Sequence, residues 1–346
     1  MDILTQVLLG AALAQSGARQ NETRIATWIG FAAGLLADAD VFIQSANDPL
    51  LTIEYHRHFT HSLFFVPFGA LLAALLLWPF VRNKLKFKRL YLFALLGYSL
   101  SGVLDTCTSY GTYILWPLVD ERIAWHVISI VDPIFTLSLL TAVIFAFRKR
   151  LGKIAMAGLA VAVLYMSLGW LQLERAEIMA RDLIVKRGHD AARVLVKPTI
   201  GNLLLWRSVY QYEHQYYVDA IRLGVTSPSR IYTGGTIPIL NPEQDLAKVE
   251  SHSMLYKDIE RFTKFSDGWV AIHPQRTDIL MDVRYSNLPN SLKPLWGIEM
   301  DIDQPNQHAK YSFYRDMSKL NRQQFVDMVL GREITVAKLT TQETAQ

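Results

Sequence analysis

The stretch EYHRHFTHSLFFVPFGALLAALLLWPFV, residues 54–81, joins a cluster of histidines directly to a long apolar run. The part from Ser62 to Val81 contains no charged residue. As a helix rising about 1.5 Å per residue, it is long enough to cross roughly 30 Å of hydrocarbon. The stretch therefore predicts a membrane span, with metal-binding side chains at the place where the span begins.

Other apolar runs lie before and after this stretch in the first half of the chain. Each approaches the length of a membrane-spanning helix, and the predicted spans are Ile25–Ile43, Leu90–Leu104, Val127–Phe147 and Ile154–Leu171. The first of these is long enough only if it includes Asp38 and Asp40. Ile3–Ala14 is apolar but short, so it stays open whether residues 1–17 cross the membrane.

The chain changes character near Glu174. After this point the long apolar runs stop, and helical patterns at 174–196, 242–265 and 315–330 alternate with the strand candidates WRSVYQY, GWVAIHP, ILMDVRY and LWGIEMDI. We therefore predict a mainly α protein: a multi-pass helical membrane bundle over residues 1–173, followed by a small soluble α+β domain of unknown role over residues 174–346.

The basic residues predict the orientation in the membrane. The chain has 35 Lys and Arg against 31 Asp and Glu, and much of this small excess lies in two short loops, Arg82–Arg89 and Arg148–Lys153. Because short basic loops stay in the cytoplasm, the chain is predicted in the inner membrane, with residues 38–61, 105–126 and the C-terminal domain on the periplasmic face. No nucleic-acid partner is expected. The lipid bilayer is the expected partner.

Acidic and histidine side chains gather on that outer face. A carboxylate inside a membrane segment is costly, so it usually has a partner, and a divalent cation would be one for Asp38 and Asp40. Neutral imidazole suits zinc and other first-row metals, while the single cysteine, Cys107, excludes a multi-cysteine zinc site. The other candidate ligands on this face are His56, His58, His61, Asp105, His126 and Asp132.

Each candidate also has a structural interpretation. The helix before Asp38 and Asp40 can end at Ala37 and leave both acids solvated, and the histidines of residues 56–61 can belong to a polar surface beside the membrane. Asp105 and Asp132 can act as helix caps. The residues alone leave these interpretations open.

The order of four motifs resembles the YdjM-type family of membrane-bound metal-dependent hydrolases. The motifs are DAD at 38–40, HRHFTHS at 56–62, LDTCTSYGTYILWP at 104–117 and ISIVDPIF at 128–135. The resemblance implies metal-site roles for Asp38, Asp40, His56, His61 and Asp105. Through a distant similarity of such proteins to zinc phospholipase C-like enzymes, it also implies a helical fold and phosphoester hydrolysis.

This chain departs from the family at one position. Many members carry a histidine four residues before the later aspartate, where this chain has Ser101. Either His58 or His126 would then supply the missing ligand, or the number of metal ions would differ. Residues 174–346 lie outside the resemblance.

These observations predict a membrane-bound metal-dependent hydrolase that uses zinc or manganese and acts on a phosphoester of a phospholipid or lipid-linked substrate. Arg57 would stabilise negative charge on the phosphoryl oxygens, and Asp40 would accept the proton of the attacking water. Two alternatives remain: an ion or proton-coupled transporter, since intramembrane acids and histidines also form such pathways, and a non-enzymatic membrane scaffold with a structural metal site.

Overall fold

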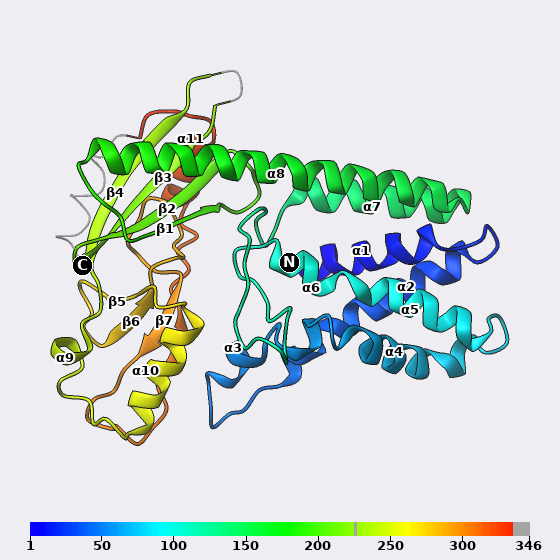
Figure 1. The fold of residues 1–346 in the computed structure, drawn as a ribbon, viewed down its shortest axis with the longest axis horizontal. Coiled ribbons are helices and arrows are strands. Elements are labelled where there is room, and N and C mark those ends of the chain that lie inside the picture. Colours follow the sequence, from blue (N-terminus) through cyan, green and yellow to red (C-terminus); the bar gives the residue numbers. More distant parts are fainter. Residues whose placement is uncertain (225–226, 335–346) are drawn as a thin grey trace. The chain divides into compact units, whose positions relative to one another are not determined.

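The computed structural model describes residues 1–224 and 227–334, and these form two compact units. One unit is Met1–Leu173 with Ile200–Leu203, and the other is Glu174–Thr199 with the described residues from Leu204 onward. The first is helical and the second is built on two antiparallel sheets (Figure 1). A helical N-terminal region followed by an α+β region agrees with the predicted fold class.

In the described residues, the helical unit contains five helices of thirteen to seventeen residues, several short helical turns, and the first part of a longer helix. In chain order they are α1 (Ile3–Ser16), α2 (Thr23–Ala37), η1 (Asp38–Phe42), α3 (Leu51–Tyr55), η2 (Phe59–His61), α4 (Val66–Val81), α5 (Phe87–Ser99), α6 (Ser101–Thr106), α7 (Pro133–Lys149) and α8 (Gly152–Lys186). The last of these continues past Leu173 into the second unit.

Glycines bring three of these helices into close contact. A Cβ atom on Gly10 of α1 would lie 2.6 Å from the carbonyl oxygen of Gly97 of α5 and 2.7 Å from that of Gly30 of α2. Small residues at helix contacts are typical of packing in membranes, where backbones approach closely. The contact fixes the end of α2, which leads into η1, relative to α5, which leads into α6.

Two helical segments are long and apolar enough to span a membrane, Thr23–Phe42 and Gly152–Lys186. A third span arises if Leu51–His61 and Val66–Val81, which meet at an angle of 90°, count as one. The predicted span at Ser62–Val81 is therefore shortened. Its helix begins only at Val66, because the Ser62 hydroxyl accepts a hydrogen bond from the Phe65 N–H and turns the chain.

Two other predicted spans are also divided or shortened. The segment Val127–Phe147 becomes helical only at Pro133, after Asp132 caps the first turn, and Leu90–Leu104 is broken at Leu100 between α5 and α6. The number of spans supported by length and composition is two or three, so a larger multi-pass bundle remains a prediction.

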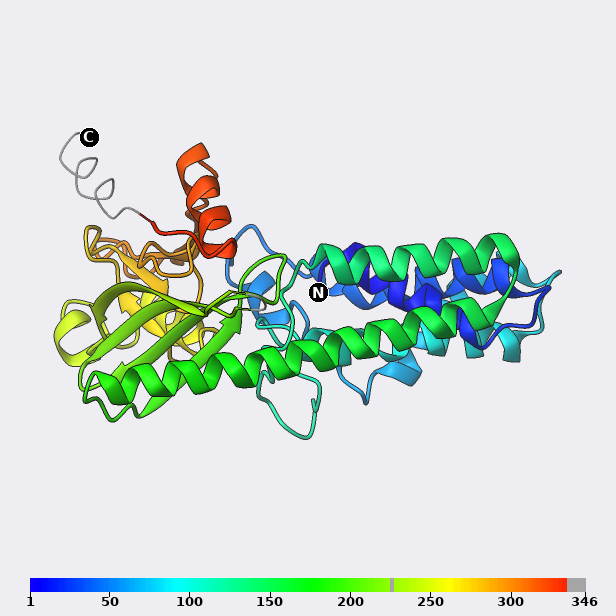
Figure 2. The same ribbon diagram turned by 90° about the horizontal axis from the view of Figure 1, so that it is seen from above.

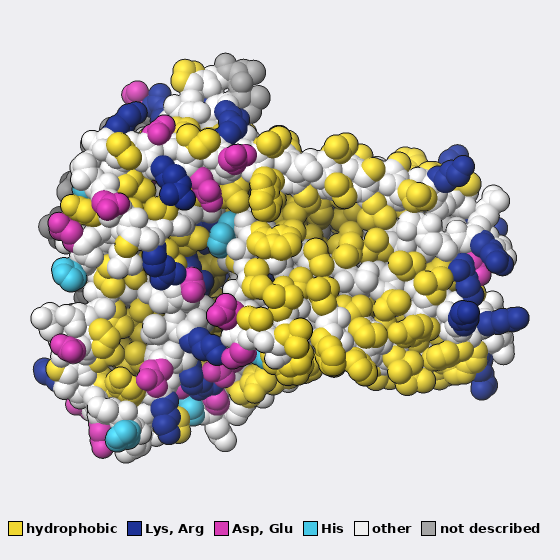
Figure 3. Space-filling model, viewed as in Figure 1, with side chains coloured by type: hydrophobic (Ala, Val, Ile, Leu, Met, Phe, Trp, Pro, Cys, Tyr) yellow, Lys and Arg dark blue, Asp and Glu magenta, His cyan; other side chains and the backbone are white. Residues whose placement is uncertain are grey.

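The two predicted cytoplasmic loops lie at the same end of the helical unit. The connections α4–α5 and α7–α8 are together at the end away from η1, η2 and α6 in both ribbon views (Figures 1 and 2). Lys and Arg side chains gather at that end, and hydrophobic side chains cover the surface between the ends (Figure 3). The Asp and His motifs thus lie at the end opposite the basic loops.

The second unit contains two four-stranded antiparallel sheets, each with its strands in chain order. One sheet is β1 (Arg193–Pro198), β2 (Leu205–Tyr212), β3 (Gln215–Arg222) and β4 (Arg230–Pro238), and the other is β5 (Val270–Ile272), β6 (Ile279–Asp282), β7 (Trp296–Glu299) and β8 (Lys310–Phe313). A shared apolar core, with Val209 and Val218 from one sheet and Ile279 and Met281 from the other, joins them. The helices of this unit, besides the end of α8, are α9 (Pro242–Asp245), α10 (Met254–Phe265) and α11 (Lys319–Val329).

The sequence predictions for this unit are partly right. All four predicted strand segments contain a strand, namely β2, β5, β6 and β7. The helix predicted over 174–196 is wrong at its end, because α8 stops at Lys186, Gly188 follows with φ of 74°, and β1 begins at Arg193. The helix predicted over 242–265 is interrupted between α9 and α10.

Candidate metal centre

The two acids of the DAD motif are buried at the end of α2. The α-helix ends at Ala37 and tightens into the 3₁₀ turn η1, in which Asp38 is 5 % and Asp40 is 1 % exposed. The α-helix thus ends at Ala37, as one interpretation of the sequence expected, but Asp38 and Asp40 are not solvated. Buried carboxylates need hydrogen-bond donors or cations as partners.

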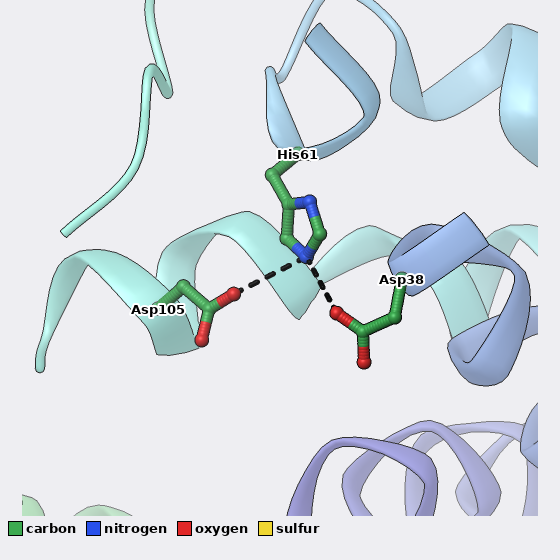
Figure 4. A group of neighbouring side chains, drawn as sticks. All are labelled: Asp38, His61 and Asp105. Atoms are coloured by element: carbon green, nitrogen blue, oxygen red, sulfur yellow. Dashed lines mark ion pairs between the residues drawn. The ribbon is translucent and has the colours of Figure 1, made fainter. Parts of the chain in front are cut away.

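His61 brings two of the distant acids together. Its Nε2 atom lies 3.3 Å from Asp38 Oδ1 and 3.2 Å from Asp105 Oδ2, and the three side chains converge from η2, η1 and α6 (Figure 4). His61 is 1 % exposed and Asp105 is fully buried. Their candidate ligand atoms all lie within 4.8 Å of one another. We call Asp38, His61 and Asp105 the three-residue centre.

The opposite edge of the imidazole is held by Asp40 and Thr60. His61 Nδ1 lies 3.3 Å from Asp40 Oδ2 and 3.0 Å from the Thr60 hydroxyl, which itself donates to Asp40 Oδ2 at 2.7 Å. Assigning the proton to Nδ1 directs the lone pair of Nε2 at the other two acids. A histidine held this way by a carboxylate is the usual arrangement of a metal ligand.

Asp40 has further partners that fix it in place. It accepts hydrogen bonds from the backbone N–H of Arg57 at 2.8 Å, and its Oδ1 lies 3.1 Å from Nδ1 of the half-buried His56. Asp40 and His56 therefore lie at the Nδ1 edge of His61, away from the three-residue centre. Their positions suit orientation of His61 more directly than ligation beside Asp38.

Several atoms of the three-residue centre lack a hydrogen-bond partner. Among the described residues this holds for both carboxylate oxygens of Asp38, for His61 Nε2 and for Asp105 Oδ2, all of them buried. Unpaired buried carboxylate oxygens are costly. A cation held by one atom of each residue would satisfy an oxygen of Asp38, His61 Nε2 and Asp105 Oδ2 together. Two carboxylates with one imidazole form a donor set that suits zinc or manganese. The residues present therefore fit a divalent metal ion.

Arg57 lies beside this centre with a constrained backbone. Its Nε is 3.3 Å from Asp105 Oδ2, its Nη2 donates to the carbonyl of Met1 at 2.6 Å, and its guanidinium lies 5.0 Å from the ring centroid of Tyr110. Its φ of 59° is in the left-handed region, which is rare for a residue other than glycine. The Thr112 hydroxyl donates to the Arg57 carbonyl at 2.6 Å and helps hold that conformation.

The short helix α6 approaches η2 through Gly102. A Cβ atom at this position would overlap the carbonyl oxygen of His61. Only glycine allows the two backbones to meet there, and Asp105 follows three residues later on the same helix. The amino group of Met1 also contacts Asp105, through Oδ1.

The remaining candidates lie apart from the three-residue centre. His58 lies 3.7 Å from the exposed Asp120 and packs on the ring of Tyr113. His126 is half-buried with φ of 56°. Asp132 caps α7 by accepting from the Phe135 N–H at 3.1 Å, and the hydroxyl of Tyr165 also donates to it. Ser101 is buried at the start of α6.

The sequence analysis did not assign roles to several residues around the centre. Thr60 was visible as the residue before His61, but its double contact follows only from the 3₁₀ turn. Tyr110 and Thr112 lie within the motif at 104–117, but their roles, like that of Gly102, depend on how separate segments meet.

Comparison with known proteins bears on residues 1–176. A family model described as YdjM inner membrane protein matches this range, which includes all three residues of the centre. No curated protein and no solved structure matches the chain.

Proposed function

Because the chain belongs to the YdjM inner membrane protein family, we propose that it works in that membrane as a metal-dependent hydrolase of a phosphoester in a lipid or lipid-linked substrate. The observation that carries the proposal is the set of buried ligand atoms on Asp38, His61 and Asp105 that have no hydrogen-bond partner among the described residues. These residues would hold a divalent cation, zinc or manganese. Such an ion would act as a Lewis acid and lower the pKa of a water molecule toward about 7.

The chain's own residues have distinct roles in this proposal. Asp40 and Thr60 orient His61 by holding its Nδ1 edge, so we assign Asp40 to positioning. Asp38 Oδ2, which is buried and has no hydrogen-bond partner among the described residues, accepts the proton of the attacking water. The water oxygen bonds to phosphorus, the bond from phosphorus to the leaving alkoxide breaks, and that proton passes to the alkoxide.

Arg57 is suited to bind the phosphoryl group. Its Nη1 is buried without a hydrogen-bond partner among the described residues, while Nε and Nη2 face Asp105 and Met1. A guanidinium with an unused donor beside a metal centre can hydrogen bond to a phosphoryl oxygen and stabilise its developing charge.

We also propose that the centre faces the periplasm in a multi-pass arrangement. The basic connections α4–α5 and α7–α8 share one end of the helical unit, and short basic loops remain in the cytoplasm. The opposite end, with η1, η2 and α6, would then lie at the outer surface, where lipid headgroups are accessible.

The direct test combines metal analysis with turnover of detergent-purified protein. Wild type should contain a stoichiometric divalent metal and hydrolyse a soluble phosphodiester and a phospholipid. His61→Ala and Asp105→Asn should lose the metal and at least about a hundredfold of the turnover, because each removes a ligand. His58→Gln is the matched control, since His58 lies outside the centre, and it should keep both.

Other results would contradict the hydrolase. Metal without turnover in wild type would indicate a scaffold, and metal-dependent ion flux in liposomes would indicate a transporter. A metal-free wild type that stays metal-free after incubation with zinc or manganese would leave His61 as a purely structural contact between two carboxylates.

A further inference from the structure

An apolar groove lies in the helical unit next to α6. It has a volume of about 730 Å³ and is lined by residues of α1, α6, α7 and α8 together with Trp125 and Val127. This size is within the range of about 300–1,000 Å³ that is usual for ligand pockets. No charged side chain is among its lining residues in the described part of the chain. Its occupant must therefore be apolar along most of its length.

The groove and the three-residue centre share one structural element. Val103 and Leu104 of α6 line the groove, and the next residue, Asp105, points into the centre beside His61. A molecule in the groove would therefore be separated from the centre by the width of one short helix.

The two ends of the groove differ in their lining residues. Trp125 and Trp170 line it and are 43 % and 54 % exposed, and tryptophan is enriched where a membrane meets water. Leu13 of α1 and Leu159 of α8 lie further along these helices, toward the basic loops. A lipid in this orientation would have its headgroup at the end of the unit that carries Asp105.

The surface around the groove is exposed and apolar. One wall is α8, a candidate membrane span that is largely exposed, with Val163 at 64 % and its neighbour Leu164 at 69 %. Hydrophobic side chains cover much of the face of this unit that is seen in Figure 3. Since the family is one of inner membrane proteins, the molecules that contact this surface are bilayer lipids.

We infer that the groove binds one acyl chain of the lipid whose phosphoester is presented to Asp38, His61 and Asp105. The inference rests on the proposed function and narrows its substrate from phosphoesters in general to lipids with a long acyl chain. The groove selects by chain length, while the centre and Arg57 recognise the phosphoryl group.

The test uses two tryptophan substitutions on the same helix. Val163→Trp places a large side chain in the groove wall, whereas Leu164→Trp adds the same side chain at an equally exposed position outside the lining. The full chain is reconstituted in vesicles of phosphatidylethanolamine and phosphatidylglycerol, with a trace of phosphatidylethanolamine that carries a photoreactive diazirine near the end of one acyl chain.

In wild type and Leu164→Trp, the label should be found on groove-lining peptides of α1 and α8. In Val163→Trp this labelling should fall about tenfold. The added side chain would displace about two methylene groups of the acyl chain from the groove, and that loss of burial weakens binding by about this factor. The kinetics should agree with the labelling. KM for a long-chain phospholipid should rise in Val163→Trp only, and turnover of a soluble phosphodiester should be equal in all three proteins. Val163→Phe should give a smaller effect, and its unchanged soluble turnover would show that the fold is intact.

Several results would overturn the inference. Equal labelling of the two tryptophan variants would mean that lipids contact the surface without a specific site. Disulfide-linked dimers of Val163→Cys in the vesicles would mean that a second copy covers the groove. If wild type hydrolyses no phosphoester but the labelling still differs between the two tryptophan variants, the proposed function fails and the acyl-chain site stands. If wild type hydrolyses the phosphoester normally but the labelling is equal, the proposed function stands and the acyl-chain site fails.

Discussion

At the scale of single residues, the two edges of one imidazole explain the centre. Nδ1 of His61 is held by Asp40 and Thr60, and Nε2 is directed at Asp38 and Asp105. The motif at residues 56–62 contains three histidines, but only His61 lies between Asp38 and Asp105 in the structure. The other two take part in neighbouring contacts.

Replacing Asp40 by Asn tests the positioning role. The substitution keeps the shape but removes the charge that favours a proton on Nδ1, so metal affinity should fall about 10–100-fold while the ligand set stays complete. Competition titration with a chelator measures this directly. Thr60→Val should give a smaller loss. Complete absence of metal in Asp40→Asn, equal to that of Asp38→Asn, would instead make Asp40 a ligand.

Lys197 of β1 provides a test of pH dependence in the second unit. Its amine is buried 3.0 Å from the ring centroid of Tyr285 and has no hydrogen-bond partner among the described residues. Burial, together with Arg284 and Arg207, holds its pKa well below the usual 10.5, and Asp282 opposes this only in part. Between the lowered pKa of the folded state and about 10.5, the unfolded chain therefore binds a proton that the folded chain does not. The fold loses stability as the pH falls through this window.

Lys197→Met should accordingly raise the free energy of unfolding at pH 7 by about 1–3 kcal/mol. The gain should shrink as the pH approaches 10.5, where the unfolded lysine also loses its proton. Denaturant unfolding of the full chain in detergent, followed by hydrogen exchange in β1, measures the free energy of unfolding at pH 7 and at pH values near 10.5. The exposed Lys310→Met is the control and should change neither. A gain that is independent of pH would mean that Lys197 is charged in the fold.

At the scale of elements, the centre depends on how closely short segments approach one another. The segments η1, η2 and α6 each have at most six residues. Helical segments this short are not stable alone. They are held by the helices that precede them and by backbone contacts such as the one at Gly102.

Gly102→Ala should therefore separate α6 from η2. The added methyl group would overlap the His61 carbonyl, and relief of that overlap costs about 1–3 kcal/mol. We expect weaker metal binding and a lower melting temperature, measured by metal analysis and by thermal unfolding in detergent. Ser101→Ala, one residue earlier in the same helix, should change neither property. Normal metal content in Gly102→Ala would show that Asp105 is not a necessary ligand.

At the scale of the whole molecule, the sequence predicted the parts with a strong local signal. The family was expected from the resemblance of four motifs. The change of character near Glu174 and the four strands around tryptophan-rich or β-branched segments follow from composition and period. The helix starts at Val66 and Pro133 could not be predicted in this way. They depend on a turn held by the Ser62 hydroxyl and on the Asp132 cap, both inside long apolar runs. The convergence of Asp38, His61 and Asp105 was inferred from topology alone, and their distances required the packing of α1, α2 and α5.

The proposed orientation is testable in the same chain. With Cys107 replaced by Ser, Asn47→Cys in the connection between η1 and α3 should react with a membrane-impermeant maleimide from the periplasmic side. Asn83→Cys, in the basic connection α4–α5, should react only after the membrane is opened, because that loop is predicted in the cytoplasm. The opposite pattern would place the centre at the inner surface.

The backbone of Arg57 is tied on both sides, since its N–H donates to Asp40 and its carbonyl accepts from Thr112. This one residue thus links segments more than fifty positions apart in the chain. During biosynthesis, a nascent polypeptide that has inserted only its first helices has the arginine but not the threonine, nor the aspartate of α6. Under the proposed hydrolase function, the complete set of contacts around the centre would form only once insertion has passed Thr112.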